Sequence, residues 1–269
     1  MSTVPLALRS VEVVSLAERE PFTADELDYF TDLLGSFSVP VPARLATARR
    51  ASFRELLGEL APRLAGPVDL AVLAAAVPDG EPGWPTSYLA SVAEVGHAFG
   101  ICDQGATGPF TALRIIAHSL RASPAARAAL LVADQRTVHH DEPVPERLRA
   151  TRNVAVAVLF DAAPAGAPVT VHGPEPLTPP AATARLRALA EGAGPVTLIL
   201  GRGLAPAAAD AVRGDGAVTV LPAPAGLPAT GVWSVLAGVL GSGGRTVVAD
   251  YCPDAGRFAA VTVGGAPPG

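Results

Sequence analysis

The sequence contains no lysine, one asparagine (Asn153), one methionine and two cysteines (Cys102 and Cys252). Without lysine, the chain can form neither a Schiff base nor the phosphate-binding site of a P-loop, because both need that side chain. Two cysteines are too few for a disulfide framework. We therefore expect a reduced, cytoplasmic protein.

Long apolar runs and a basic surface are also missing. No uninterrupted apolar run reaches the ~18 residues that a membrane span requires. The first residues, MSTVPLALRSVEVV, lack the cationic start and long apolar stretch of a secretory signal. A net charge of -5 argues against a nucleic-acid partner, and 49% hydrophobic with 17% charged residues excludes intrinsic disorder. We expect a folded protein that binds neither membrane nor nucleic acid.

Apolar runs alternate with amphipathic segments along the chain. The run from Val68 to Val77 lies between turn-forming glycine and proline residues, which is typical of a buried central strand. Further strands are expected at residues 4–16, 98–102, 128–133, 153–160, 196–200, 217–221, 246–249 and 258–263. Helices are expected at residues 23–34, 42–64, 84–95, 107–121, 180–191, 206–212 and 230–240. This alternation predicts a layered α/β fold.

The segment from Asp161 to Pro180 is dense in proline, alanine and glycine. We interpret it as a connection between two halves. The predicted division places one half at residues 1–165 and the other at residues 166–269. The second half repeats the strand and helix pattern in fewer residues.

Three stretches carry recognisable motifs. The first is VDLAVLAAAVPD at residues 68–79, followed by WPTS at 84–87. The second, AFGICDQGATGPFTAL at residues 98–113, predicts a strand, a tight turn and a buried helix. The third joins ATGVWS at residues 229–234 to GRTVVADYCPDAG at 244–256. In this order they resemble the ketoacyl-ACP synthase III branch of the thiolase-fold condensing enzymes.

The resemblance implies a thiolase-like, layered αβαβα fold with two pseudo-repeated halves, the second of them shortened. In those enzymes a cysteine at a helix N-terminus attacks an acyl thioester. The helix dipole and backbone N–H groups favour the thiolate and the developing oxyanion. A histidine and an asparagine from the second half assist decarboxylation and hold the thioester carbonyl.

Alignment of the second motif with the family through the following helix places the nucleophile position on Ala106. Alignment through the preceding strand places it on Gly105. The histidine position falls within Gly201–Gly203, and the asparagine position falls on Ala229. No histidine follows His172, and the single asparagine lies in the first half. The resemblance thus implies a chain without the three catalytic groups, for which we do not expect ordinary Claisen condensation.

Residues close to these positions remain as candidates. The candidate catalytic residues are Cys252, His97 and Asp250, with Asp254 as a further acid. The expected substrate-binding residues are Gln104, Gly105, Ala106, Thr107, Ala229 and Tyr251, with Asp103 beside them, although Asp103 and Gln104 could equally cap the following helix. For Cys252 we favour a packing role over that of a displaced nucleophile.

Other chemistry-bearing residues are interpreted as structural. Cys102 is expected in the core, and His118 is expected to be a satisfied histidine on a central helix. The run from His139 to Glu142 has no further ligand to complete a tetrahedral site, so we predict a solvated or interface loop and no metal.

Three functions remain open. The first is a noncatalytic subunit that pairs with an active synthase III-type ketosynthase in polyketide or fatty-acyl secondary metabolism. The second is an enzyme of altered chemistry, performing acyl transfer, hydrolysis or cyclisation on an acyl thioester. The third is a homodimeric carrier or binding protein. No cofactor is expected, and the implied ligands are acyl-CoA or a phosphopantetheine-linked acyl group on an acyl carrier protein.

Overall fold

The computed structural model describes residues 6–18, 20–80, 83–102, 104–123, 126–138, 140–141, 144–161, 166–192, 194–204, 206–212 and 217–264. The strands of the first half are β1 (Leu6–Leu16), β2 (Glu20–Pro21), β3 (Arg49–Arg50), β4 (Val68–Ala75), β5 (Val95–Ile101), β6 (Arg127–Asp134) and β7 (Asn153–Asp161). Those of the second half are β8 (Ala167–Pro176), β9 (Val196–Leu200), β10 (Val218–Pro222), β11 (Arg245–Cys252) and β12 (Arg257–Val263).

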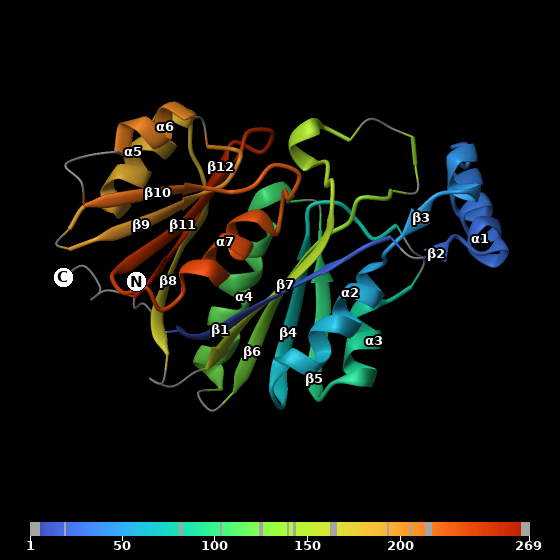
Figure 1. The fold of residues 1–269 in the computed structure, drawn as a ribbon, viewed down its shortest axis with the longest axis horizontal. Coiled ribbons are helices and arrows are strands. Elements are labelled where there is room, and N and C mark those ends of the chain that lie inside the picture. The colour runs from blue at the N-terminus through green and yellow to red at the C-terminus, as the bar shows by residue number, and fades with distance from the viewer. Residues whose placement is uncertain are drawn as a thin grey trace.

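The α-helices are α1 (Ala24–Gly35), α2 (Phe53–Leu60), α3 (Pro85–Val92), α4 (Gly108–Ala122), α5 (Pro179–Ala190), α6 (Pro206–Val212) and α7 (Gly231–Val239). Short 3-10 helices are η1 (Ala43–Ala46), η2 (Ala61–Leu64), η3 (Gly105–Thr107) and η4 (Glu146–Leu148). Within the described residues, the main sheet has the order β10-β9-β11-β12-β8-β1-β7-β6-β4-β5 (Figure 1).

The two halves repeat one arrangement of elements. The first half-sheet has the order β5-β4-β6-β7-β1, and the second has the equivalent order β10-β9-β11-β12-β8. Helices α2, α3 and α4 take the same places between strands as α5, α6 and α7. The half-sheets join where β1 pairs with β8 over a short antiparallel stretch at Leu6–Leu8. The second half is shorter, since it lacks a counterpart to the arm from β2 to β3.

Side-chain alternation along the strands builds five layers. In β4, Leu70, Val72 and Ala74 face the inner core, which also contains α4, α7 and the inner face of the second half-sheet. Ala71 and Leu73 face the opposite way and pack with α2 and α3. The outer face of the second half-sheet packs with α5 and α6 in the same manner. The result is a layered αβαβα fold, because each half-sheet is buried on both faces.

Helices α4 and α7 form the central layer, between the two half-sheets (Figure 1). Their contact centres on Phe110 and Trp233, whose ring centroids lie 5.2 Å apart. Both side chains are buried, with Trp233 1% exposed and Phe110 0% exposed. No described helix is both long enough and apolar enough to cross a membrane.

The structure corrects two elements expected from the sequence. The segment predicted to be a plain connection contains strand β8, which pairs with both β1 and β12. Its proline and glycine residues concealed the strand. The helix predicted at residues 42–64 is instead η1, strand β3, α2 and η2 in succession. Ser52 caps α2 through its hydroxyl, so the helix begins at Phe53.

Replacement of the central tryptophan tests the importance of the middle layer. Trp233→Ala should lower the free energy of unfolding by about 3–5 kcal/mol, because it leaves a cavity between α4 and α7. The matched control is Trp84→Ala, since Trp84 is 81% exposed, and its effect should stay within about 0.5 kcal/mol. Urea denaturation followed by far-UV circular dichroism measures both. Equal losses for the two variants would contradict the assigned packing.

Candidate functional site

The carboxyl ends of parallel strands from both halves meet at one place. Strand β5 leads into η3 and the start of α4, while β9 and β11 end at Leu200 and Cys252. Within each half these strands run parallel, so their carboxyl ends share one edge. We call the group formed by Gly105, Gly201, Ala229, Asp250 and Cys252, which lie at or just beyond these ends, the elbow site.

Gly105 occupies the turn before α4 and has a φ of 51°, a conformation that glycine adopts without strain. A Cβ atom at this position would lie 3.1 Å from the Sγ atom of Cys252 and 3.5 Å from the Cδ2 atom of Leu148. Both Gly105 and Cys252 are buried. The structure therefore brings the second and third sequence motifs together, and Leu148 from η4 closes the turn.

The Asp250 carboxylate fills the space beside the loop that follows β9. A Cβ atom on Gly201 would overlap this carboxylate, and one on Gly203 would overlap the backbone oxygen of Tyr251. The backbone N–H groups of Gly203 and Tyr251 donate to Asp250 Oδ1 over 3.1 Å and 2.7 Å. Glycine at positions 201 and 203 is thus a steric requirement, and no larger side chain fits there beside Asp250.

Burial raises the pKa of Asp250 to about 7, and its two backbone hydrogen bonds only partly oppose this shift. The side chain is 3% exposed. Near neutral pH, Asp250 is therefore close to its midpoint and exists partly as the neutral acid.

A second buried carboxylate, Asp134 at the end of β6, holds the start of α7. It accepts hydrogen bonds from Ala229 N at 3.1 Å, Thr230 N at 2.8 Å and Thr230 Oγ1 at 2.7 Å. Burial raises its pKa to about 6, against the opposing effect of these bonds. The sequence analysis missed Asp134. The repeat of LLVAD at residues 130–134 and TVVAD at 246–250 was the available signal.

The expected substrate-binding residues fall into two groups. Gly105, Thr107 and Ala229 are buried at the elbow site, while Ala106 and Gln104 are partly exposed beside it. Tyr251 points elsewhere. Its ring packs in the outer core of the second half, and its hydroxyl donates to the Leu177 carbonyl oxygen over 3.1 Å.

The other candidate catalytic groups lie away from Cys252. His97 is exposed on β5. It lies four positions before Ile101, the last residue of β5, which corresponds to roughly 13 Å along the strand. Asp254 is paired with Arg147. Cys102, expected in the core, is exposed because it follows the last residue of β5. Within the described ranges, the structure brings no histidine to the elbow site.

The remaining histidines are placed as follows. His118 lies on α4, the central helix, as expected, and its side chain is exposed. Asp103, His139 and Glu142 fall outside the described residues. The described residues contain no cluster of three or more His, Cys, Asp or Glu side chains that could hold a metal ion.

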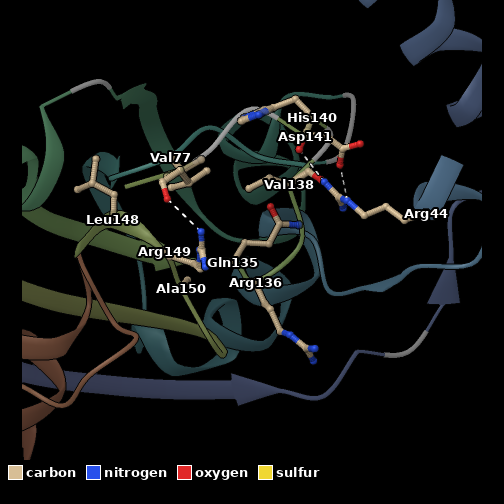
Figure 2. A pocket seen from close by; sticks show the side chains of 11 residues that line it. Arg44, Val77, Gln135, Arg136, Val138, His140, Asp141, Leu148, Arg149 and Ala150 are labelled. Atoms are coloured by element: carbon tan, nitrogen blue, oxygen red, sulfur yellow. Dashed lines mark hydrogen bonds and ion pairs between the residues drawn. The ribbon is translucent and has the colours of Figure 1, made fainter. Parts of the chain in front are cut away.

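A cavity of about 290 Å³ lies next to the elbow site (Figure 2). Leu148 lines this cavity and also lies against the Gly105 position, so it separates the two. Three arginines, Arg44, Arg136 and Arg149, contribute to its wall. We call it the mouth cavity.

One wall of the mouth cavity comes from the arm between β2 and β3. Arg44 of this arm donates to Asp141 Oδ1 over 2.8 Å and to the carbonyl oxygens of His140 and Val138 over 2.6 Å and 3.2 Å. These contacts join the arm to the loop after β6, as Figure 2 shows. The arm is thus part of the cavity and not a separate appendage.

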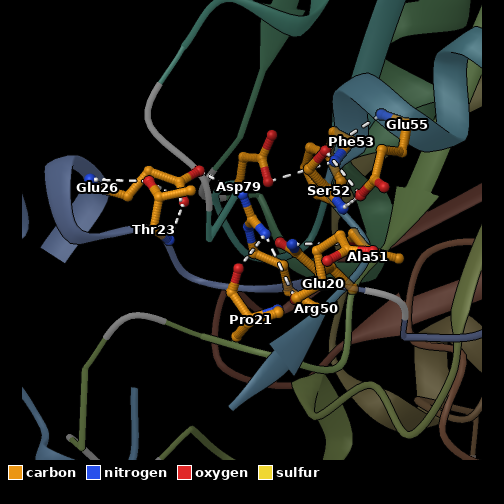
Figure 3. Close-up of polar contacts among 11 residues, drawn as sticks. Glu20, Pro21, Thr23, Glu26, Arg50, Ala51, Ser52, Phe53, Glu55 and Asp79 are labelled. Atoms are coloured by element: carbon orange, nitrogen blue, oxygen red, sulfur yellow. Dashed lines mark hydrogen bonds and ion pairs between the residues drawn. The ribbon is translucent and has the colours of Figure 1, made fainter. Parts of the chain in front are cut away.

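The base of the arm is held by the buried guanidinium of Arg50 (Figure 3). Arg50 forms an ion pair with Glu26, donates to the Pro21 carbonyl oxygen over 3.1 Å, and lies 4.9 Å from the ring centroid of Phe22. Glu26 in turn completes the capping box of α1 with Thr23. Because one side chain links β2, α1 and β3, the arm has a defined position.

Solved structures of several condensing enzymes share this fold. The tetronic acid condensing enzyme AbyA1 matches with a TM-score of 0.65 and 15% identity, over 97% of this chain and 100% of its own. The acyltransferase ChlB3 has a TM-score of 0.61 and 16% identity over 98% of each chain. The 3-oxoacyl-(acyl carrier protein) synthase III of Pseudomonas aeruginosa has a TM-score of 0.62 and 17% identity, over 98% of this chain and 100% of its own.

The chain therefore has the thiolase-like fold of the synthase III-type enzymes, as the three sequence motifs predicted. No protein-family model matches the sequence, and no curated protein sequence matches it.

Insertion of a side chain at Gly201 tests the packing around Asp250. Gly201→Ala should destabilise the protein by about 1–3 kcal/mol or more, because the new methyl group displaces the Asp250 carboxylate. Gly238→Ala is the matched control: it adds a methyl group to α7 with no neighbour within 4 Å, and it should stabilise the helix by about 0.5–1 kcal/mol. Thermal unfolding compares the two. A neutral Gly201→Ala would show that the carboxylate does not fill this space.

Titration of Asp250 should be visible in the pH dependence of stability. Its folded pKa of about 7 exceeds the ordinary value of 3.8, so between these pH values the folded state binds more protons than the unfolded state. Asp250 therefore makes stability fall as pH rises through this window, with a slope of up to about 1.4 kcal/mol per pH unit.

Asp250→Asn keeps an acceptor for Gly203 and Tyr251 but cannot ionise. Urea denaturation of both proteins between about pH 5 and pH 8, a range that covers the upper part of the window, isolates the contribution. The wild type should lose stability relative to the variant as pH rises. Parallel pH profiles would contradict the burial of this carboxyl group.

Proposed function

We propose that this chain is a noncatalytic thiolase-fold subunit that pairs with an active synthase III-type ketosynthase in the biosynthesis of a polyketide or fatty-acyl metabolite. The observation that carries the proposal is the elbow site itself. Its turn residue is Gly105, against which Cys252 and Leu148 pack, and Asp250 fills the space beside Gly201.

The chemistry of condensation motivates this reading. An attacking thiolate needs a positioned sulfur and a base, and a developing oxyanion needs donors aimed at it. In the described part of the site, the buried ionisable side chains are the thiol of Cys252 and two carboxyl groups with raised pKa values, Asp134 and Asp250. None of these groups is an imidazole or a carboxamide, which are the two groups that the resemblance assigns to decarboxylation and to holding the thioester carbonyl. The site therefore supports a structural role better than a condensing one.

Strand β5 is the surface that we assign to the partner. Among the described residues it lies at the end of the sheet and pairs with β4 on one side, which leaves backbone N–H and C=O groups along the other. Phe99 on this strand is 39% exposed, and Val92 on α3 and Trp84 just before α3, the helix that packs against β5, are 48% and 81% exposed. An unpaired strand edge next to exposed apolar side chains suits a partner that adds its own strand.

The partner is inferred to be a thiolase-fold chain that retains the cysteine, histidine and asparagine missing here. Pairing across β5 would continue its sheet into this one. Acyl-CoA or an acyl group on a carrier protein then binds in the partner's active site. Contact with this chain stabilises the shape of that active site.

Reconstitution with such a ketosynthase tests the function. The partner's condensing activity should fall by about tenfold or more when this chain is omitted, and also when it carries Phe99→Asp, which places a charge in the proposed interface. Phe37→Asp is the matched control, because Phe37 is 73% exposed on the arm, far along the chain from β5. Full partner activity without this chain would refute the proposal.

A second function, catalysis of altered chemistry on an acyl thioester, is favoured by one observation: the thiol of Cys252 lies 3.1 Å from the Cβ position of Gly105. Orientation and oxyanion stabilisation alone can accelerate acyl transfer or hydrolysis. The purified chain would then turn over acyl-CoA, and Cys252→Ala would abolish turnover while Cys102→Ala would not. Absence of turnover in the wild type rejects this alternative.

A further inference from the structure

A second cavity, of about 360 Å³, lies between the two halves next to the turn before α4. The first half contributes Gln104, Thr107, Thr111 and Arg114, and the second half contributes Pro174 and Arg257. The first four recur at intervals of three or four residues, so they form one stripe along η3 and α4. We call this the arginine cavity.

The lining of the arginine cavity carries positive charge without a balancing acid. None of its described lining residues is an aspartate or a glutamate. Arg114 and Arg257 are exposed, and neither makes a hydrogen bond or an ion pair within the described part of the chain. Other arginines show the contrast, since Arg44, Arg50 and Arg127 each form an ion pair with a carboxylate.

The polar groups of the stripe are arranged to donate. Thr111 Oγ1 donates to Gln104 Oε1 over 2.6 Å, and Thr107 Oγ1 donates to the Gln104 carbonyl oxygen over 2.9 Å. The side-chain oxygen of Gln104 is thereby occupied, and its amide N–H groups remain as donors. An amide and two guanidinium groups are complementary to an oxyanion.

The helix that begins at this cavity adds to the same potential. Helix α4 has 15 residues and starts with no side-chain cap at its N-terminus. Its partial positive charge has the same sign as the two guanidinium groups. Three independent features thus favour an anionic ligand. They are the two unpaired arginines, the oriented Gln104 amide and the N-terminus of α4.

We propose that the arginine cavity binds a small organic anion through a phosphate or carboxylate group. The guanidinium groups of Arg114 and Arg257 hold the charged oxygens, and the Gln104 amide donates a further hydrogen bond. A volume of about 360 Å³ accommodates a few carbon atoms beyond the anionic group, and it lies at the small end of ligand sites in proteins. The proposal does not depend on a partner subunit or on any reaction at Cys252.

Calorimetric titration of the full-length chain tests this site with three probes at constant ionic strength: inorganic phosphate, glycerol 3-phosphate and succinate. Binding of the two phosphates alone identifies the phosphate group as the ligand, and binding of succinate alone identifies the carboxylate. Combined Arg114→Gln and Arg257→Gln should weaken the binding by about tenfold or more, since two charge-assisted contacts are lost.

Arg121→Gln is the matched control, because Arg121 is also exposed on α4 but does not line the cavity. Its affinity should equal that of the wild type. Circular dichroism melts of all variants without ligand check that the fold is retained. The proposal is overturned if none of the three probes binds, or if the double variant binds as tightly as the wild type and the control.

Discussion

The central layer of two buried helices is the constraint on which the rest of this structure depends. Helices α4 and α7 pack on each other and on the inner faces of both half-sheets, with Phe110 against Trp233 at the contact. Because each helix begins where its strands end, burying both helices forces their starts into one region. The elbow site is therefore a consequence of core packing, and it would exist whether or not it carried chemistry.

Within that region, side chains and backbone are closely packed. Asp134 holds the start of α7, Asp250 occupies the room beside Gly201, and Cys252 and Leu148 close on Gly105. The two aspartates occupy equivalent places at the ends of β6 and β11, which reflects the repeat of the halves. Burial raises the pKa of both carboxyl groups, so the fold holds two titratable side chains at equivalent places in the two halves.

The arm between β2 and β3 is joined to the loop after β6 by arginine contacts. Arg50 holds the base of the arm, and Arg44 joins its far part to the loop that also carries Leu148. The mouth cavity is consequently assembled from segments far apart in sequence. Arginines near the elbow site differ in their partners: Arg44 and Arg50 of the arm form ion pairs with acids, whereas no ion pair is found for Arg114 and Arg257 within the described residues.

Local patterns were sufficient to predict the alternating strands and helices, since buried strands and helix starts have strong local signals. The thiolase-like layering was predicted from the resemblance of three motifs, which also placed Cys252 near the turn before α4. They failed at β8, whose prolines and glycines are tolerated because its neighbours β1 and β12 supply the pairing. They also failed at Asp134, Cys102 and Tyr251. Whether a side chain is buried, exposed or turned to an outer layer depends on elements distant in sequence, and that information exists only once the two halves have packed together.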